Sequence, residues 1–284
     1  MVVVQYYKYD PSIPLAIIGG IAFALLFVAH TIRVWQFKTR YMFIMMVVCG
    51  MEVVGFAARV YSINNLTNRT AVIVSSIGLI IPPVLSCAAL YMIFGRFIHY
   101  VGNQYSFLKG NLVAVVFVIS DIVTFLVQVY GATALVGSDT GPKVDRGRNI
   151  LFGGLIIQVA SFSVFVVAVI AFHFRVSKSA APHIPARREW TPLLWALHIN
   201  SACILIRSIF RIIEFSKAIP ALETTEAYFY VFDTLLIVIA TAVMAWWHPG
   251  NRIYPEKPLA DENLIDGEHH RGAHGLDSIR AVNK

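Results

Sequence analysis

Charged residues are scarce in this sequence. Only 14% of the 284 residues are Asp, Glu, Lys or Arg, whereas 57% are hydrophobic. Soluble globular domains carry about 25% charged residues and about 45–50% apolar ones. The composition therefore excludes an ordinary soluble domain and indicates an integral membrane protein. Cysteine is also rare, and Cys49, Cys87 and Cys203 all fall inside apolar segments, where they are expected to be small buried hydrophobes without a disulfide framework.

Two catalytic motifs are missing as well. The sequence has no GxxxxGK[ST] phosphate-binding loop, so we expect no ATPase activity of its own. It has no GxSxG nucleophile elbow either. The net charge of +7 is better explained by basic loops at a cytosolic membrane face than by a nucleic-acid partner.

Long hydrophobic runs are abundant. Seven of them reach the roughly 20 residues that a membrane-spanning helix requires. The first has no preceding basic region and is too long for a signal-peptide core, so it is expected to remain as a helix. We predict an all-α, seven-transmembrane-helix bundle, with a short lead-in (1–12), a transmembrane domain (13–248) and a disordered cytosolic tail (249–284). The predicted spans are 13–34, 41–61, 71–94, 111–130, 150–173, 191–213 and 226–247.

The distribution of Lys and Arg predicts the orientation of the bundle. Fourteen of these residues fall in the tail and in the connections on one side, and six fall on the other side. The positive-inside rule then places the N-terminus outside and the C-terminus in the cytosol. Two glycosylation sequons, at Asn65 and Asn68, lie in a connection on the predicted outer side and agree with this orientation.

Two local features predict interruptions of regular helix. The connection 131–149, GATALVGSDTGPKVDRGRN, contains many glycines and charges, so we expect an exposed loop rather than a helix. Pro82-Pro83 falls in the middle of the third span, where a missing backbone N–H is expected to kink the helix.

The sixth and seventh spans carry charges with matching spacing. Arg207, Arg211 and Glu214 follow an i, i+4, i+7 pattern, so they lie on one helical face. The next span repeats the pattern with Glu226, Tyr230 and Asp233. Two antiparallel helices with a short connection bring residues of equal depth together. This spacing predicts an Arg207–Asp233 ion pair, with Arg211 near Tyr230; the pair either belongs to a ligand site or only joins two helices.

Further polar residues are expected at a similar depth. The distance of each residue from the predicted end of its helix gives its depth in the membrane. Five polar residues share one depth and form a layer, and Arg59 and Gln128 lie nearer the outer surface. Counted with Glu214 and Glu226, five carboxyl groups face three guanidinium groups, and this balance of −2 suits a cation with a hydrocarbon tail. Glu52 and Asp121, which have no assigned Arg, are candidates for proton carriers; the alternative is a hydrogen-bond network that fixes the helix register. The layer comprises Glu52, Asp121, Gln158, Arg207 and Asp233.

A layer of histidines is expected near the inner face. His30, His173, His198 and His248 occur once each on four spans, and such clusters can hold zinc or haem. None of them shows a ligand spacing such as HExxH, and histidines near helix ends are ordinary interfacial residues. We therefore expect no metal or cofactor, with these four residues as the only alternative metal site.

Several of these patterns occur together in one known family. The chain resembles the fungal RTA-like lipid-translocating exporter family over about residues 7–250. The most specific element is Arg207-Ser208-Ile209-Phe210-Arg211 with Glu214-Phe215. One departure is His198, where the family pattern leads us to expect tyrosine. The other matching elements are Tyr7-Lys8-Tyr9-Asp10-Pro11-Ser12, Glu52-Val53-Val54-Gly55-Phe56 with Arg59, Cys87-Ala88-Ala89, Tyr91-Met92, Gly95-Arg96, Asp121 with Gln128 and Gly131, Gly154-Leu155 with Gln158, Phe172-His173-Phe174-Arg175, Tyr230-Val231-Phe232-Asp233 and His248-Pro249-Gly250.

The resemblance implies a function in lipid export. Members of this family are seven-helix proteins linked to aminocholesterol resistance and to export of sphingoid long-chain bases. It implies a plasma-membrane protein, or alternatively an endomembrane one, that moves sphingoid bases or similar cationic amphiphiles and confers resistance to toxic lipids or drugs. Two alternatives stay open: a seven-helix lipid sensor, although no DRY or NPxxY pattern is present, and an intramembrane metal-dependent lipid hydrolase that uses the histidines. The sequence indicates no protein partner.

Overall fold

The computed structural model describes residues 11–65, 68–106, 109–136, 141–178, 187–216, 219 and 225–251. Every regular element in these ranges is helical, and seven helical spans are long and apolar enough to cross a membrane. This confirms the predicted all-α class and the seven spans. The helices are α1 (Ile13–Phe37), α2 (Phe43–Asn64), α3 (Arg69–Val101), α4 (Gly110–Val136), α5 (Gly141–Lys178), α6 (Arg187–Ser216) and a last span made of α8 (Glu226–Phe229), the π-helical turn η3 (Tyr230–Thr234) and α9 (Leu235–Trp246).

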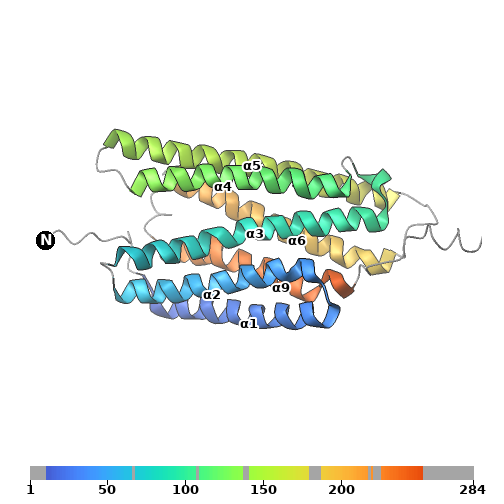
Figure 1. Cartoon of the computed structure of the whole chain (residues 1–284), viewed down its shortest axis with the longest axis horizontal. Coiled ribbons are helices and arrows are strands. Elements are labelled where there is room, and N and C mark those ends of the chain that lie inside the picture. The colour runs from blue at the N-terminus through green and yellow to red at the C-terminus, as the bar shows by residue number, and fades with distance from the viewer. Residues whose placement is uncertain are drawn as a thin grey trace, which may run out of the picture. The chain divides into compact units, whose positions relative to one another are not determined.

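The helices lie roughly along one common axis (Figure 1). Each helix packs against its successor in the chain, and α9 contacts both α6 and α1, so the bundle closes on itself. Helix α3 also contacts α6 across the bundle. We call the end that holds the start of α1 the N-terminal end, on the left in Figure 1, and the opposite end the C-terminal end. Three single-turn 3-10 helices occur at the C-terminal end, η1 (Arg40–Met42), η2 (Asn103–Tyr105) and η4 (Pro249–Asn251).

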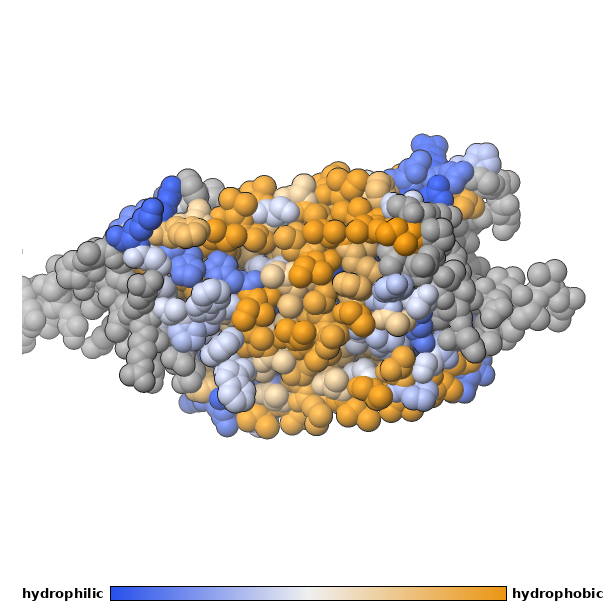
Figure 2. Space-filling model, turned by 180° about the vertical axis from the view of Figure 1, so that it is seen from behind, coloured by the Kyte–Doolittle hydropathy of each residue, from blue (hydrophilic) through white to orange (hydrophobic). Residues whose placement is uncertain are grey.

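The outer surface carries a wide belt of apolar side chains. Figure 2 shows hydrophobic residues across the middle of one face, with more hydrophilic residues toward both ends. Large aliphatic side chains such as Ile18, Leu25, Leu126 and Val167 are each at least 60% exposed. A soluble protein rarely leaves so continuous an apolar surface to water, whereas lipid tails solvate it without penalty. The belt therefore agrees with a membrane-embedded bundle.

Small residues allow neighbouring helices to approach closely. A Cβ added to Gly78 of α3 would lie 2.7 Å from the Cα of Gly55 in α2. Likewise, a Cβ added to Gly131 of α4 would lie 2.5 Å from the backbone nitrogen of Leu151 in α5. Such contacts are typical of membrane helices, because packing between backbones replaces the hydrophobic driving force that lipid cannot supply.

The predicted loop at 131–149 is wrong. Helix α4 continues to Val136 and α5 already begins at Gly141, so only residues 137–140 lie outside the described helices of this region. A glycine inside a helix costs about 1 kcal/mol relative to alanine, which is why the local sequence predicts a loop. Here the contact of Gly131 with α5 offsets that cost. Helix α3 is continuous through Pro82 and Pro83, and the kink expected there remains a prediction.

The half of the bundle toward the C-terminal end is filled by aromatic rings. Tyr91 of α3 meets Phe165 of α5 edge to face, with ring centroids 4.7 Å apart. Phe94 contacts Phe165 and Phe172 at 5.6 and 5.5 Å in the same geometry. Edge-to-face pairs satisfy the quadrupoles of both rings and add stability beyond simple contact. We call this set the aromatic block; it comprises Tyr91, Phe94, Phe97, Phe117, Phe162, Phe165, Phe172 and Trp190.

The predicted tail begins inside an ordered turn. Pro249–Asn251 form η4, and the Gly250 N–H donates to Nδ1 of His248 at 3.2 Å. The position of Gly250 is tight, since an added Cβ would lie 2.5 Å from Cγ2 of Thr39. The predicted disorder therefore does not apply to residues 249–251, and the rest of the tail, like residues 1–10 of the lead-in, lies outside the described residues.

Candidate functional site

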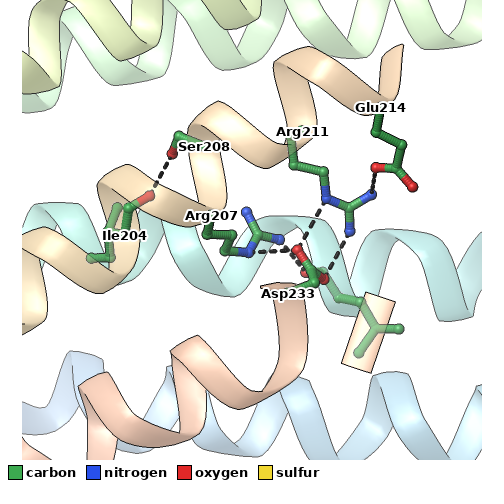
Figure 3. Close-up of polar contacts among 7 residues, drawn as sticks. Ile204, Arg207, Ser208, Arg211, Glu214 and Asp233 are labelled. Atoms are coloured by element: carbon green, nitrogen blue, oxygen red, sulfur yellow. Dashed lines mark hydrogen bonds and ion pairs between the residues drawn. The ribbon is translucent and has the colours of Figure 1, made fainter. Parts of the chain in front are cut away.

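Four side chains form a charged cluster between α6 and the last span: Arg207, Arg211, Glu214 and Asp233 (Figure 3). Arg211 binds Asp233 with two parallel hydrogen bonds, Nε to Oδ1 at 3.0 Å and Nη2 to Oδ2 at 2.8 Å. Its third nitrogen, Nη1, donates to Glu214 Oε2 at 3.1 Å. A planar guanidinium suits this two-pronged geometry, so all three nitrogens of Arg211 are engaged.

The predicted ion pair between Arg207 and Asp233 is present. Arg207 Nε lies 2.7 Å from Asp233 Oδ1, the same oxygen that Arg211 Nε contacts. The pairing at this distance is electrostatic, because the N–H of Arg207 is not aligned for a hydrogen bond. Arg211, expected beside Tyr230, instead joins Arg207 on the same carboxylate. Asp233 thus holds two arginines, and its side chain is 5% exposed.

Asp233 lies inside a π-helical turn. The turn covers Tyr230–Thr234 and interrupts the α-helical path between α8 and α9. A π turn adds one residue to the hydrogen-bonded loop and rotates the side chains that follow it, and such turns are frequent at functional sites. The i, i+4, i+7 pattern from Glu226 to Asp233 assumes a regular α-helix, so the sequence does not reveal this change in register.

Arg207 also donates a hydrogen bond to a backbone carbonyl of α3 that has no helical partner because of a proline. In a regular helix the N–H of residue 83 would bond to the carbonyl of Leu79, but Pro83 has no N–H. Arg207 Nη2 donates to this Leu79 oxygen at 3.4 Å. The proline pair in α3 therefore provides an acceptor for a buried guanidinium of α6.

Glu52 of α2 faces the charged cluster without joining it directly. Its side chain is buried and within electrostatic range of Arg207, Arg211 and Asp233. Among the described residues, however, none makes a hydrogen bond or an ion pair with its carboxyl group. The two arginines are balanced by Asp233 and Glu214, so Glu52 is a surplus carboxyl group beside a neutral cluster.

A second ion pair closes the N-terminal end. Arg59 Nη2 lies 2.8 Å from Glu226 Oε1, and both side chains are less than 10% exposed. The other oxygen, Oε2, accepts the backbone N–H of Ser12 at 2.7 Å, just before α1 begins. The Arg59 guanidinium also stacks on the ring of Phe229, 4.6 Å from its centroid. Glu226 therefore links α1, α2 and the last span.

Asp121 of α4 lies apart from the arginines. Its Oδ2 accepts the hydroxyl of Tyr91 at 2.8 Å, while Oδ1 is buried and accepts no hydrogen bond from the described residues. Cys87, one turn before Tyr91 on α3, is a buried thiol near Asp121. The charged residues of the predicted layer therefore fall into two separate groups, one around Asp233 and one around Asp121.

Gln158 belongs to neither group. Its Oε1 accepts a hydrogen bond from Nε2 of Gln128 at 2.9 Å between α5 and α4. The predicted difference in depth between the two glutamines is wrong, because both helices extend further toward the N-terminal end than their hydrophobic runs.

The four histidines form two pairs in different places. His173 Nδ1 and His198 Nε2 lie 2.9 Å apart between α5 and α6. His30 contacts the carbonyl of Thr241 at 3.1 Å and lies near His248. Within the described ranges, no three His, Cys, Asp or Glu side chains gather closely enough to hold a metal ion. The alternative four-histidine metal site therefore does not fit the arrangement of the side chains.

The two sequon asparagines lie at helix ends, Asn65 after the end of α2 and Asn68 before the start of α3. Asn65 follows α2, and its side chain donates to the carbonyl of Tyr61 at 3.1 Å. Asn68 caps the start of α3, because its Oδ1 accepts the N–H of Ala71 at 3.2 Å. Glycosylation of either residue remains a prediction.

Three groups contact the buried charges but were not among the site residues predicted from the sequence. They are the backbone N–H of Ser12, the carbonyl of Leu79 and the hydroxyl of Tyr91. The backbone of Ser12 and the carbonyl of Leu79 carry no side-chain signal, although the proline four residues after Leu79 marks a free acceptor. Tyr91 had a visible signal, since a buried tyrosine needs a partner for its hydroxyl. What the sequence does not show is which carboxyl group it contacts.

Comparison with known proteins supplies the family. Residues 45–256 match the family described as RTA1 like protein. The chain is 30% identical to Protein RTM1 of Saccharomyces cerevisiae over 69% of its own length and 63% of that protein. It is 33% identical to Protoporphyrin uptake protein 1 of the same yeast, over 69% of this chain and 65% of that one. It is also 29% identical to the Sphingoid long-chain base transporter RSB1, over 78% and 68% of the two chains.

The chain thus spans slightly less than two thirds of the length of RTM1 and of the protoporphyrin uptake protein. No solved structure matches it. The family match covers most of the seven-helix bundle, including the charged cluster, Glu52 and Asp121. This integral membrane protein therefore belongs to the RTA1-like family.

Proposed function

We propose that this protein moves amphipathic lipids with a cationic head group, such as sphingoid long-chain bases, across the bilayer without an ATPase of its own. The observation that carries the proposal is the position of Glu52. It is a buried carboxyl group in a membrane-spanning helix, next to a cluster whose charges already balance. An ionised group at this depth costs roughly 2.5–3.5 kcal/mol and normally faces a partner or a polar cavity. A single ammonium group would be such a partner.

The surrounding charges favour a cation over an anion. An amine beside Glu52 would also lie within the field of Asp233, while the two arginines stay engaged with Asp233 and Glu214. The hydrocarbon tail needs no polar partner and can remain in contact with the apolar belt and the lipid. The name of one relative, a sphingoid long-chain base transporter, supports this substrate class. Export of toxic amphiphiles by this route would confer resistance to them, and the proposed location is the plasma membrane.

The proposal can be tested with purified protein in liposomes that contain an isotope-labelled sphingoid base. We expect faster movement of the unaltered molecule between leaflets, reduced at least tenfold in Glu52→Gln. The matched control is Asp145→Asn, the same loss of a carboxylate at a side chain that is 62% exposed. This control should transport at the wild-type rate.

Other outcomes would overturn the proposal. A changed mass of the labelled lipid would indicate an enzyme, such as a lipid hydrolase. Binding without transfer would indicate a lipid sensor. Equal transfer rates in Glu52→Gln and the wild type would show that Glu52 does not hold the head group.

A further inference from the structure

We propose that Asp121 and Tyr91 form a proton-binding site that is separate from the charged cluster and is reached from the N-terminal end of the bundle. This goes beyond the proposed function, because it concerns a second ligand at a second place. The proton site would exist whether or not lipid transport occurs. Its use as a driving force for transport rests on the proposed function.

The first observation is the unequal bonding of the two Asp121 oxygens. The residue is 2% exposed. Oδ2 accepts the Tyr91 hydroxyl at 2.8 Å, and Oδ1 is buried with no hydrogen-bond partner among the described residues. A carboxylate buried in this way loses its hydration and gains one neutral hydrogen bond in return, which does not compensate the loss.

The second observation is the charge environment. Asp233 is held by two guanidinium groups, whereas no described Lys, Arg or His side chain makes an ion pair with Asp121. Two titratable side chains of α3 face Asp121, the phenol of Tyr91 and the thiol of Cys87. Neither of them can carry a positive charge. From α5, the neighbouring described side chains are Ser161 and aromatic rings, which carry no charge. Arg207 of α6 contacts Asp233 and the Leu79 carbonyl rather than Asp121. A proton is therefore the cation that is available to this carboxyl group.

The third observation is the different character of the two sides of Asp121. Toward the C-terminal end, Tyr91 packs against Phe117, Phe162 and Phe165 of the aromatic block, with centroid distances from 4.7 to 6.3 Å. Toward the N-terminal end, α4 presents Thr124 and Gln128, and Gln128 bonds to Gln158. Side chains that can exchange hydrogen bonds with a proton or with water thus lie on one side, and rings that exclude both lie on the other.

This arrangement gives two buried acids different tasks. Glu52 faces arginines and is suited to a cationic head group, whereas Asp121 faces a phenol and is suited to a proton. Pairs of carboxyl groups in contrasting environments commonly divide work in this way. One proton taken up at Asp121 from the N-terminal side and released again would link lipid movement to a proton gradient.

The experiment is infrared spectroscopy of the purified protein in lipid vesicles at pH 5, where an ordinary aspartate is still ionised, without lipid substrate. We expect a carbonyl stretching band of a protonated carboxyl group that disappears in Asp121→Asn. In Tyr91→Phe the band should remain and move to higher frequency, because the acid loses the hydrogen bond from the phenol. Glu52→Gln should leave this band in place. Identical spectra in the wild type and Asp121→Asn would overturn the proposal.

Thermal denaturation of the same variants provides a second readout. If Asp121 is neutral, the change to Asn preserves its shape and charge, so the melting temperature should hardly change. Asp233→Asn is the matched control, since it removes an anion that holds two arginines, and it should lower the melting temperature strongly. Equally large losses at the two positions would mean that Asp121 is an anion, and the proposal would be wrong. Neither readout requires transport, so failure of the proposed function would be recognised separately.

Discussion

The charged cluster and the aromatic block occupy opposite halves of the same bundle and stabilise it by different means. Around Asp233, four side chains from two segments are joined by directed contacts of 2.7 to 3.1 Å. Around Phe165, rings from α3, α4 and α5 meet at 4.7 to 5.7 Å with no net charge. The first half depends on exact partners and retains a surplus carboxyl group at Glu52, whereas the second half is filled. Under the proposed function, the lipid head group binds in the half toward the N-terminal end, and the aromatic block only supports the bundle.

The largest effect is expected from Asp233→Ala. This change leaves the buried guanidinium group of Arg207 and the partly buried one of Arg211 without their shared anion, and breaking a buried pair in this way costs about 3–5 kcal/mol. Thermal melting of the purified protein in detergent measures the loss. Adding Arg207→Met should recover part of it, because one uncompensated cation is then removed. A double variant no more stable than Asp233→Ala would contradict the pairing, and Glu214→Gln, at a side chain that is 20% exposed, should cost less than about 1 kcal/mol.

Removing a ring from the aromatic block should lower the stability of the bundle and leave lipid transfer unchanged. Phe165→Ala removes a ring that touches four others. We expect a loss of about 3 kcal/mol, at the low end for buried phenylalanine, because lipid solvates apolar groups in the unfolded state. The lipid transfer rate per folded molecule should stay at the wild-type level. A specific loss of transfer would place the aromatic block in the transport path and would end the division between the two halves.

Helix approach in the N-terminal half can be tested with a pair of glycines. Gly131→Ala places a methyl group 2.5 Å from the Leu151 backbone nitrogen, so α4 and α5 must separate at a cost of about 1–3 kcal/mol. Gly153→Ala is the matched control in α5, because nothing lies within 4 Å of the added atom. It should stabilise the helix by up to about 1 kcal/mol. Similar melting temperatures for the two variants would show that the contact at Gly131 is not limiting.

The smallest effect at neutral pH is expected at the C-terminal end, from His248→Asn. Burial, with His30 and Arg33 nearby, lowers the pKa of His248 to about 4, so the folded state holds a neutral ring. The unfolded chain takes up this proton near pH 6.5. Wild-type stability should therefore be highest above pH 6.5 and should fall as the pH decreases toward 4. His248→Asn keeps an acceptor for the Gly250 N–H, so it should change stability at pH 7 by less than about 1 kcal/mol. It should also reduce the loss at low pH, and an unchanged pH profile would assign the loss to other groups.

Much of the fold could be predicted from the sequence, because lipid imposes simple requirements. Each span must satisfy its own backbone hydrogen bonds, so a run of about 20 apolar residues is already a helix. The Arg207–Asp233 pair was accessible for a similar reason, since a short connection between antiparallel helices fixes which depths meet. The helices at 131–136 and 141–149 were not predicted, because glycine lowers the stability of an isolated helix. Its stabilising effect comes from close packing against a neighbouring helix, which the local sequence does not show.

The partners of the other buried charges required the tertiary structure. Arg59 and Glu226 are 167 positions apart, and their depth alone does not tell which helices are neighbours. The same holds for Tyr91 and Asp121, and for the Leu79 carbonyl that Arg207 contacts. The π turn at Asp233 is equally hidden, because it follows from how the last span packs and not from any residue type within it.

Hydropathy and helical spacing are properties of each segment alone, so they suffice to identify a seven-helix membrane protein with ionisable groups buried in the bundle. The contacts of those groups follow from how the segments pack: Asp233 holds two arginines, Glu52 remains beside a balanced cluster and Asp121 faces a tyrosine. In lipid, the segment that carries a charge sets its location, whereas its energy depends on the partner that another segment brings to it.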